Sequence, residues 1–293
     1  MRWKKLGRSK NVEHRRGGPG GSRPVAMGGG LGMIIIALIA VFVFKIDPSK
    51  LLGGMPQGQQ QTQTKPSSAE EAELEEFITA IKFSTEQEWT QVFAQAGQSY
   101  RAPKMVDYDG MTRMNNGSTA DARMGPFYLP AEETIYLDTA FFGQMKNQFN
   151  AGGDFAYAYV IAHEVGHHVQ KLLGRTDYVH KQKGRISELE YNRLSVRLEL
   201  QADFLAGVWA HHADKRMRAS TGQGLLEKGD VEEAMAAAEA IGDDALQRQA
   251  GGRVVEDSFT HGSSEQRLRW FMKGLRTGAA NQGDTFAVSY DDL

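Results

Sequence analysis

The 293-residue chain contains no cysteine, which excludes disulfides, thiolate zinc sites and a cysteine nucleophile. It also lacks an excess of either charge, because 34 Lys and Arg against 36 Asp and Glu leave a formal net charge of −2. That balance removes the simplest electrostatic argument for nucleic-acid binding, so we expect no nucleic-acid partner. Hydrophobic residues make up 41% of the chain, enough for one large or two small domains with a real core.

The balanced total conceals a lopsided N-terminus. Within residues 1–30, eight Lys or Arg residues against the single Glu13 give +7, so the remainder of the chain carries −9. The following stretch, Val25–Phe44, contains no charged residue, and twenty helical residues match the hydrocarbon core of a bilayer. We therefore predict a basic arm (residues 1–24) followed by a single transmembrane anchor (residues 25–44).

A cleaved signal peptide and a buried soluble helix are the alternatives to this anchor. The sequence Phe44–Pro48 offers no cleavage site of the small-x-small type, which favours an uncleaved anchor. The positive-inside rule keeps the basic arm in the cytoplasm, next to anionic lipid. We therefore expect a single-pass protein of the bacterial inner membrane, with its C-terminal part in the periplasm or outside the cell.

A polar linker and one domain follow. Residues 45–69 are rich in Gln, Pro and Ser and cannot fill a core. Residues 70–293 are predicted to form a mostly helical α+β domain with a small antiparallel sheet, built from Lys104–Tyr108 and a hairpin of Phe127–Leu129 with Thr134–Leu137. Helices are predicted at 70–82, 85–97 (opened by a capping box of Thr85 and Glu88), 139–149, 154–173, 187–217, 230–249 and 263–277.

The stretch Ala162–Gln170 contains the motif H-E-x-x-H. His163 and His167 are four residues apart, so on a helix they can occupy adjacent corners of a tetrahedral zinc site. Glu164 is rotated by about 100° from His163, where it can accept a proton from a zinc-bound water. His168 lies off this face, so we interpret it as a surface residue or as a residue that contacts one of the ligands. The alternative is a helix with incidental histidines, since the motif arises by chance in roughly one such chain per hundred.

A third ligand has to come from another part of the chain. Glu199 and Asp203 are four residues apart on the predicted helix 187–217. Beside them runs an apolar stripe of Leu194, Leu198, Ala202, Leu205 and Trp209. A carboxylate next to a core-facing stripe is costly unless it is paired or bound to metal. We interpret Glu199 as the ligand and Asp203 as a residue that orients a zinc histidine through its ring N–H. A solvated pair of acids is the alternative.

The segments H-E-V-G-H-H-V-Q, N-R-L-S-V-R-L-E-L-Q-A-D and D-S-F-T-H-G-S together resemble the bacterial neutral zinc metallopeptidase family. The resemblance covers nearly the whole chain, including the basic arm, the anchor and the linker. It implies a zincin-like domain of the gluzincin type, with Zn²⁺ as the cofactor. By position it implies His163, His167 and Glu199 as ligands, Glu164 as the catalytic base and Asp203 behind them.

The resemblance also implies cysteines that this chain lacks. Relatives carry cysteines in the hairpin region, after the Ala-Asp of the second segment and near the C-terminus, where this chain has Leu129, Phe204 and Gly283. Contacts that disulfides stabilise in relatives are therefore expected to be stabilised by packing in this chain. None of the proposed ligands is affected.

His261 is a further catalytic candidate. It lies just before a predicted helix that Ser263 and Gln266 open as a capping box. From there it could approach the metal and stabilise a tetrahedral oxyanion, and a purely structural role is the alternative. The resemblance to membrane gluzincins implies an arginine some residues further on, which here is Arg267.

The sequence therefore predicts a membrane-anchored zinc endopeptidase that hydrolyses a peptide or protein substrate with a metal-activated water. The substrate is expected to pair as an extended strand with Thr134–Leu137. One alternative is a zinc-stabilised interaction protein on the membrane that has no catalytic turnover. Glu164 argues against it, because a structural zinc site needs no base beside the metal. A metal-free helical scaffold is the other alternative, and zinc content would separate it from both.

Overall fold

The computed structural model describes residues 1–15, 68–121, 124–148, 151–249 and 251–293. The predicted anchor (residues 25–44) and nearly all of the predicted linker (residues 45–69) lie outside these ranges. Among the helices within these ranges, none is long and apolar enough to cross a membrane.

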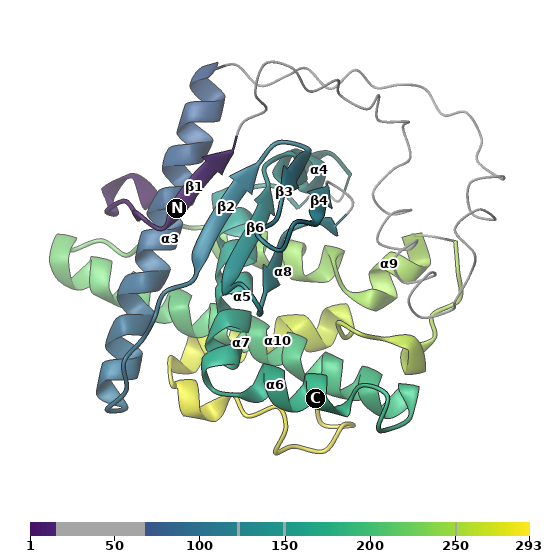
Figure 1. Cartoon of the computed structure of the whole chain (residues 1–293). Coiled ribbons are helices and arrows are strands. Elements are labelled where there is room, and N and C mark those ends of the chain that lie inside the picture. Colours follow the sequence, from purple (N-terminus) through teal and green to yellow (C-terminus); the bar gives the residue numbers. More distant parts are fainter. Residues whose placement is uncertain (16–67, 122–123, 149–150, 250) are drawn as a thin grey trace.

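A four-stranded mixed sheet packs against the helical part of the molecule (Figure 1). Its strands, in spatial order, are β1 (Val12–Arg15), β2 (Lys104–Tyr108), β6 (Thr134–Asp138) and β5 (Phe127–Leu129). The predicted hairpin is confirmed, because β5 and β6 are antiparallel. The expectation of an antiparallel sheet is otherwise wrong, since β2 is parallel to both β1 and β6. Between β2 and β6 the chain forms a small hairpin of β3 (Met111–Arg113) and β4 (Thr119–Asp121) and then β5, so β6 enters in the direction of β2.

The N-terminal residues are part of this fold. The sequence predicts residues 1–24 as a separate basic arm, but their described part, residues 1–15, packs on the domain. β1 pairs with β2 along its whole length and lies beside α3 (Figure 1). Ahead of it the short 3-10 helix η1 (Trp3–Lys5) places Trp3, which is only 4% exposed, edge-on against Phe77 at 5.4 Å between ring centroids. The strand at this edge of the sheet was not predicted.

The helices of the described ranges follow the predicted pattern with three differences. They are α3 (Ser68–Gln95), α4 (Ala140–Gln148), α5 (Asp154–Leu172), α6 (Arg175–Gln182), α7 (Glu188–Thr221), α8 (Asp230–Ala240), α9 (Asp243–Gln249) and α10 (Ser264–Thr277). The break that the sequence predicts before Thr85 is absent. α3 continues through this position, and the Thr85 hydroxyl donates to the carbonyl of Lys82 in the same helix. The predicted helix 230–249 is two helices, with Gly242 at the break, where a Cβ would lie 2.5 Å from the backbone nitrogen of Ser264. Helix α6 was not predicted.

Close backbone contacts hold α5, α7 and α10 together. A Cβ on Gly207 of α7 would lie 2.2 Å from a carbonyl oxygen of α10, and one on Gly274 of α10 would lie 2.0 Å from a carbonyl oxygen of α7. Gly166 of α5 faces Ala202 of α7, where a Cβ would lie 3.0 Å from the carbonyl oxygen. Because Gly166 belongs to the H-E-x-x-H segment, this contact brings that segment against the predicted third-ligand helix.

Packing joins two of the positions at which the resemblance implies cysteines, Phe204 and Gly283. A Cβ on Gly283 would lie 2.1 Å from the ring of Phe204, so this ring fills the space next to the glycine backbone. Phe204 is fully buried. The large aromatic ring and the missing side chain together form a packed joint between α7 and the C-terminal segment.

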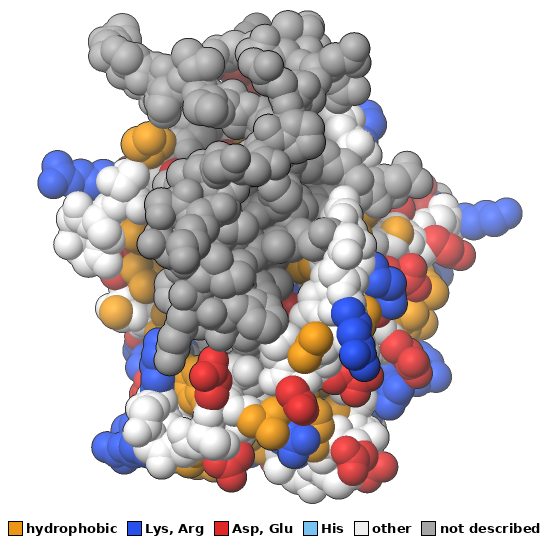
Figure 2. All heavy atoms as spheres, turned by 90° about the vertical axis from the view of Figure 1, so that its right-hand side faces the viewer, with side chains coloured by type: hydrophobic (Ala, Val, Ile, Leu, Met, Phe, Trp, Pro, Cys, Tyr) orange, Lys and Arg blue, Asp and Glu red, His pale blue; other side chains and the backbone are white. Residues whose placement is uncertain are grey.

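The described side chains on the face seen in Figure 2 carry both signs of charge. Lys and Arg side chains lie interspersed with Asp and Glu side chains around the part of the surface that is not described. This mixture agrees with the near-neutral net charge of the chain.

Candidate metal centre

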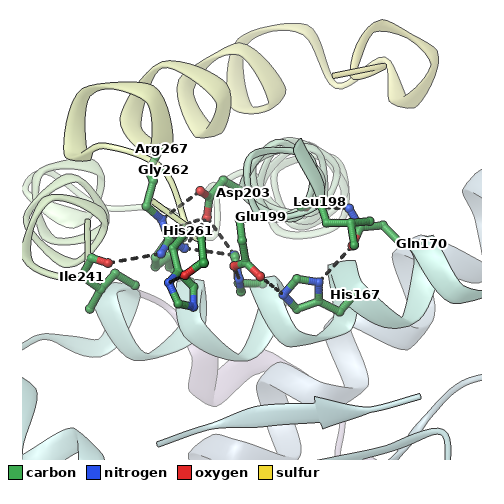
Figure 3. A network of polar contacts seen from close by, with 12 residues as sticks. His167, Gln170, Leu198, Glu199, Asp203, Ile241, His261, Gly262 and Arg267 are labelled. Carbon is green, nitrogen blue, oxygen red and sulfur yellow. Dashed lines mark hydrogen bonds and ion pairs between the residues drawn. The ribbon is translucent and has the colours of Figure 1, made fainter. Parts of the chain in front are cut away.

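The three predicted ligands come together from α5 and α7. Figure 3 shows Glu199 facing His167. His163 Nε2 lies 3.2 Å from Glu199 Oε2, and His167 Nε2 lies 3.5 Å from Glu199 Oε1. One donor atom from each residue lies within 4.8 Å of the other two. The two imidazole rings are 4.7 Å apart and nearly perpendicular. The structure therefore brings together the residues that the sequence selected, although 32 residues separate His167 from Glu199.

The chemistry of this donor set fits zinc. Two imidazole nitrogens and one carboxylate are borderline to hard ligands, and three protein ligands leave a fourth position for water or substrate. Such open sets are typical of catalytic zinc, whereas structural sites are closed by four protein ligands. The side chains are largely shielded, with His163 7% exposed, so their charges act in a medium of reduced polarity.

Asp203 fixes the orientation of His163. Its fully buried carboxylate accepts from His163 Nδ1 at 2.7 Å and from the Tyr159 hydroxyl at 2.6 Å. Arg267 donates to both of its oxygens, through Nε and Nη2, each at 3.0 Å. Because Nδ1 is bound to Asp203, Nε2 is the nitrogen of His163 that faces Glu199 and that would bind a metal. This is the orienting role that the sequence assigns to Asp203.

Gln170 does the same for His167, a role that the sequence does not predict. Its amide nitrogen donates to the carbonyl of Leu198 at 2.7 Å and to Gln201 Oε1 at 3.1 Å. Its amide oxygen therefore faces His167 Nδ1, at 2.9 Å, and can only accept. His167 must carry its proton on Nδ1, which leaves Nε2 free toward Glu199. The available signal was an amide three residues after the second histidine, on the same side of the helix.

Comparison with known proteins identifies the family. The family described as "Putative neutral zinc metallopeptidase" matches residues 1–286. The chain belongs to this family. "Uncharacterized protein YpfJ" of Escherichia coli (strain K12) is 48% identical over 297 residues, which cover 99% of this chain and 100% of the relative. "Uncharacterized protein Rv2575" of Mycobacterium tuberculosis is 43% identical over 196 residues, which cover 65% of this chain and 64% of the relative. No solved structure matches the chain.

In this member of the zinc metallopeptidase family, the ligand side chains shift one another's protonation. Burial lowers the pKa of His163, but Asp203 and Glu199 outweigh burial and raise it to about 10. Burial also opposes the charge of His167, whose pKa Glu199 nevertheless raises. Burial of the Glu199 carboxyl favours its neutral form, yet the two imidazoles hold its pKa well below the usual range. A bound cation would compete with protons for these same lone pairs.

Glu164, the predicted catalytic base, belongs to the same turn of α5 as His163. It follows His163 on α5, and its side chain is 7% exposed. Its charge helps to raise the pKa of His167. This placement is suited to proton transfer at the open position of a catalytic zinc site.

His261 reaches the site from the loop before α10, and Asp243 holds that loop. Asp243 Oδ2 accepts from the backbone N–H groups of Thr260 and His261 at 2.7 Å and from that of Gly262 at 3.2 Å. Its Oδ1 lies 3.1 Å from His261 Nδ1, which leaves Nε2 of this ring free. Burial lowers the pKa of His261, but Asp243 and Glu199 raise it overall.

Arg267 lies behind the ligands rather than beside the open position. The predicted capping box of Ser263 and Gln266 opens α10, and Arg267 projects from its first turn. The guanidinium is almost fully buried and binds Asp203 (Figure 3). It also lies 3.4 Å from the Tyr159 hydroxyl. Arg267 therefore fixes the carboxylate that orients His163.

His168 is buried and links α5 to the sheet. Its Nε2 lies 2.6 Å from the carbonyl of Arg101, and its Nδ1 lies 2.9 Å from the hydroxyl of Tyr128 on β5. A carbonyl can only accept, so the proton of His168 is on Nε2, and the tyrosine donates to Nδ1. The reading of His168 as a surface residue is therefore wrong. Its contacts fix the position of β5 relative to the metal centre.

Proposed function

We propose that this metallopeptidase-family protein is a zinc-dependent endopeptidase. The observation that carries the proposal is the convergence of His163, His167 and Glu199. Glu164 directly follows His163 in the H-E-x-x-H segment. The zinc would be held by Nε2 of each histidine and by the carboxylate of Glu199. When bound, zinc supplies a Lewis acid that activates water and polarises the scissile carbonyl.

The residues of this chain then have separate tasks. Glu164 accepts the proton of the attacking water and returns it to the leaving amine. Asp203 and Gln170 keep the Nδ1 protons of the two histidines in place, so both rings stay oriented without reorganisation. His261, whose Nδ1 lies 3.1 Å from Asp243 Oδ1, would donate from Nε2 to the oxyanion that develops on the substrate.

The strand of the sheet that could pair with a substrate differs from the one expected from the sequence. Thr134–Leu137 lies in β6, which is paired with β2 on one side and with β5 on the other. The outer strand on this side of the described sheet is β5 (Phe127–Leu129). Tyr128 joins it to His168, the residue after His167, so this edge lies beside the metal centre. An extended peptide substrate would add to β5 by backbone hydrogen bonds.

Membrane attachment is a separate proposal that rests on the apolar sequence of residues 25–44. This segment lies outside the described residues. The single-pass orientation, with a cytoplasmic N-terminus and a periplasmic or extracellular domain, stays a prediction.

The test of the enzymatic proposal compares two carboxamide variants of the full chain. Wild type should hold about one zinc per chain, as one open site requires. Glu164→Gln keeps size and hydrogen bonding but removes the base, so zinc content should persist while cleavage of a peptide library falls at least about a hundredfold. Glu199→Gln replaces an anionic ligand by a neutral one and should weaken zinc binding itself.

Glu265→Gln, at an 82% exposed position of α10, is the control and should leave both readouts unchanged. Metal analysis and digestion of the same preparations give the two readouts. Full activity of Glu164→Gln on a verified substrate would exclude its role as the base. Stoichiometric zinc in a wild type that cuts no peptide would favour the zinc-stabilised interaction protein.

A further inference from the structure

The hydrogen bond that orients His167 continues as far as the C-terminal segment, residues 283–293. Gln170 accepts from His167 Nδ1 at 2.9 Å, and its own Nε2 donates to Gln201 Oε1 at 3.1 Å. Gln201 Nε2 then donates to the backbone carbonyl of Gly283 at 3.0 Å. Gln170 is fully buried and Gln201 is 7% exposed. This hydrogen-bond chain connects the second histidine of H-E-x-x-H with a segment more than one hundred residues further along the sequence.

Each bond in the hydrogen-bond chain has a fixed direction. The carbonyl of Gly283 can only accept, so Gln201 must present its amide nitrogen to it and its amide oxygen to Gln170. The second N–H of Gln170 donates to the carbonyl of Leu198, and Figure 3 shows the Gln170 side chain bridging Leu198 and His167. Rotation of either amide would bring two oxygens face to face and leave a buried N–H without an acceptor, which is costly.

The C-terminal segment is fastened to the part of α7 that carries the third candidate ligand. The fully buried Thr285 donates its hydroxyl to the carbonyl of Arg197 at 2.6 Å. The guanidinium of Arg197 donates to the carbonyls of Thr285 and Val288. Arg197 lies only two residues before Glu199 on α7. These bonds fix the Gly283 carbonyl relative to the helix that supplies Glu199.

We propose that Gln201 and the backbone carbonyl of Gly283 are positioning groups of the metal centre, through which the C-terminal segment keeps the ring of His167 in its orientation. Both groups act through Gln170, whose amide loses one of its two acceptors if either of them moves. The orientation of the ring is a property of the metal-free chain. Its consequence for zinc affinity rests on the proposed function.

Two variants interrupt the hydrogen-bond chain at different points and leave the candidate ligands and Gln170 in place. Gln201→Leu removes the middle amide. Gly283→Ala displaces the terminal carbonyl, because the added methyl group would lie 2.1 Å from the buried ring of Phe204. The φ angle of Gly283 is −103°, which alanine adopts without strain, so the contact with Phe204 is the main effect of this substitution.

Nuclear magnetic resonance of the metal-free full chain, with isotope-labelled histidine, tests the orientation without zinc. The structure places a proton on His167 Nδ1 whether the ring is neutral or positively charged, and its hydrogen bond should protect it from exchange with water. The signal is assigned by its absence in His167→Gln. We expect a protected signal in wild type and its loss in Gln201→Leu and in Gly283→Ala. Absence of the signal in wild type, or its persistence in either variant, would overturn the proposal.

A double-mutant cycle on zinc affinity tests whether the two groups act as one unit. Competition with a chromophoric chelator compares wild type, both single variants and the double variant. We expect each single variant to lower the affinity about three- to tenfold, less than the 10–100-fold typical of a direct partner of a ligand. The double variant should be no weaker than Gln201→Leu, because without Gln201 the position of the Gly283 carbonyl no longer affects His167. Fold-losses that multiply in the double variant would contradict the proposal.

Two controls separate this positioning role from a general loss of stability. Ser289→Ala alters an exposed residue of the same segment, whose hydroxyl donates to Asp292, and should leave both readouts unchanged. Trp3→Ala removes a buried ring that bonds to Asp154, at the opposite end of α5, and should keep the His167 signal. Loss of that signal in Trp3→Ala would show that it follows stability and would overturn the proposal. A wild type that shows the protected proton but binds no zinc would refute the proposed function and support the positioning role.

Discussion

The two histidines of the candidate metal centre are oriented by acceptors of different charge. His163 is held by the carboxylate of Asp203, whereas His167 is held by the neutral amide of Gln170. An anionic acceptor makes an imidazole a stronger base, so His163 is expected to be the stronger of the two nitrogen donors. The amide instead connects His167 to the backbone at Leu198, the neighbour of the third ligand.

Replacing Gln170 should weaken metal binding without removing a ligand. Gln170→Leu deletes the acceptor of the His167 Nδ1 proton and the donor to Leu198, and we expect zinc affinity to fall by about 10–100-fold. Gln201→Leu disturbs the same buried amide pair without touching His167, and it should have a smaller effect. Competition with a chromophoric chelator measures both affinities. An unchanged affinity in Gln170→Leu would show that packing alone orients His167.

His168 should make the stability of the protein depend on pH. Burial lowers the pKa of this imidazole below its usual value of 6.5, because the folded state requires the neutral ring. Below about pH 6.5 the unfolded chain therefore binds a proton that the folded chain does not, so the free energy of unfolding falls as pH falls through this range. Between pH 7.5 and pH 5.5, urea unfolding should show a larger decrease in the free energy of unfolding for wild type than for His168→Gln. Equal losses would rule out a buried neutral His168.

At the scale of elements, the site depends on how closely three helices approach. The H-E-x-x-H segment is on α5, Glu199 and Asp203 are on α7, and Arg267 is on α10. Glycine at the α7–α10 contact removes the side chains that would otherwise separate the two backbones. The reach of Arg267 to Asp203 is a consequence of that short distance.

Gly274→Ala should therefore be destabilising and should also loosen the metal centre. The added methyl group would lie 2.0 Å from the Phe204 carbonyl oxygen, and overpacking of this kind costs about 1–3 kcal/mol of unfolding free energy. Gly143→Ala is the matched control, because this helical glycine of α4 has no neighbour within 4 Å and its replacement should stabilise by about 0.5–1 kcal/mol. Urea unfolding measures both. A neutral Gly274→Ala would mean that the two helices can move apart at no cost.

At the scale of the whole molecule, the described N-terminus is a structural part of the domain. Trp3 lies in the main core, together with residues of α3 and α5, and its indole N–H has a partner at the start of α5. A fragment that begins at residue 68 would expose this part of the core and the edge of β2. We expect such a fragment to be less stable than the full chain for that reason.

Trp3→Ala tests this contribution in a chain of full length. Removal of a buried tryptophan side chain typically costs about 3–5 kcal/mol of unfolding free energy. Lys10→Ala, in the same segment but exposed, should change stability by less than about 0.5 kcal/mol. Denaturant unfolding followed by far-UV circular dichroism compares the variants. Equal stabilities of the two variants would mean that the N-terminal segment contributes little to the core.

The sequence by itself determined the local elements and the chemistry that they carry. The period of apolar residues predicted α5 and α7, and alternation with turn residues predicted β2 and the β5–β6 hairpin, because these patterns act between neighbours in the chain. The spacing of four residues put His163 with His167, and Glu199 with Asp203, on common helix faces. That spacing was enough to single out the three residues that the structure brings together as a candidate metal centre, and the carboxylate that binds His163.

Only the tertiary structure decided which distant segments meet. Gln170 and Arg267 acquire their roles from partners on other helices, and β1 pairs with a strand more than eighty residues further along the chain. The charges of residues 1–15 suggested free cytoplasmic groups because sequence shows the sign of a charge but not its partner. Long-range pairing depends on packing and on the burial of polar groups across the whole chain, and no local period records it.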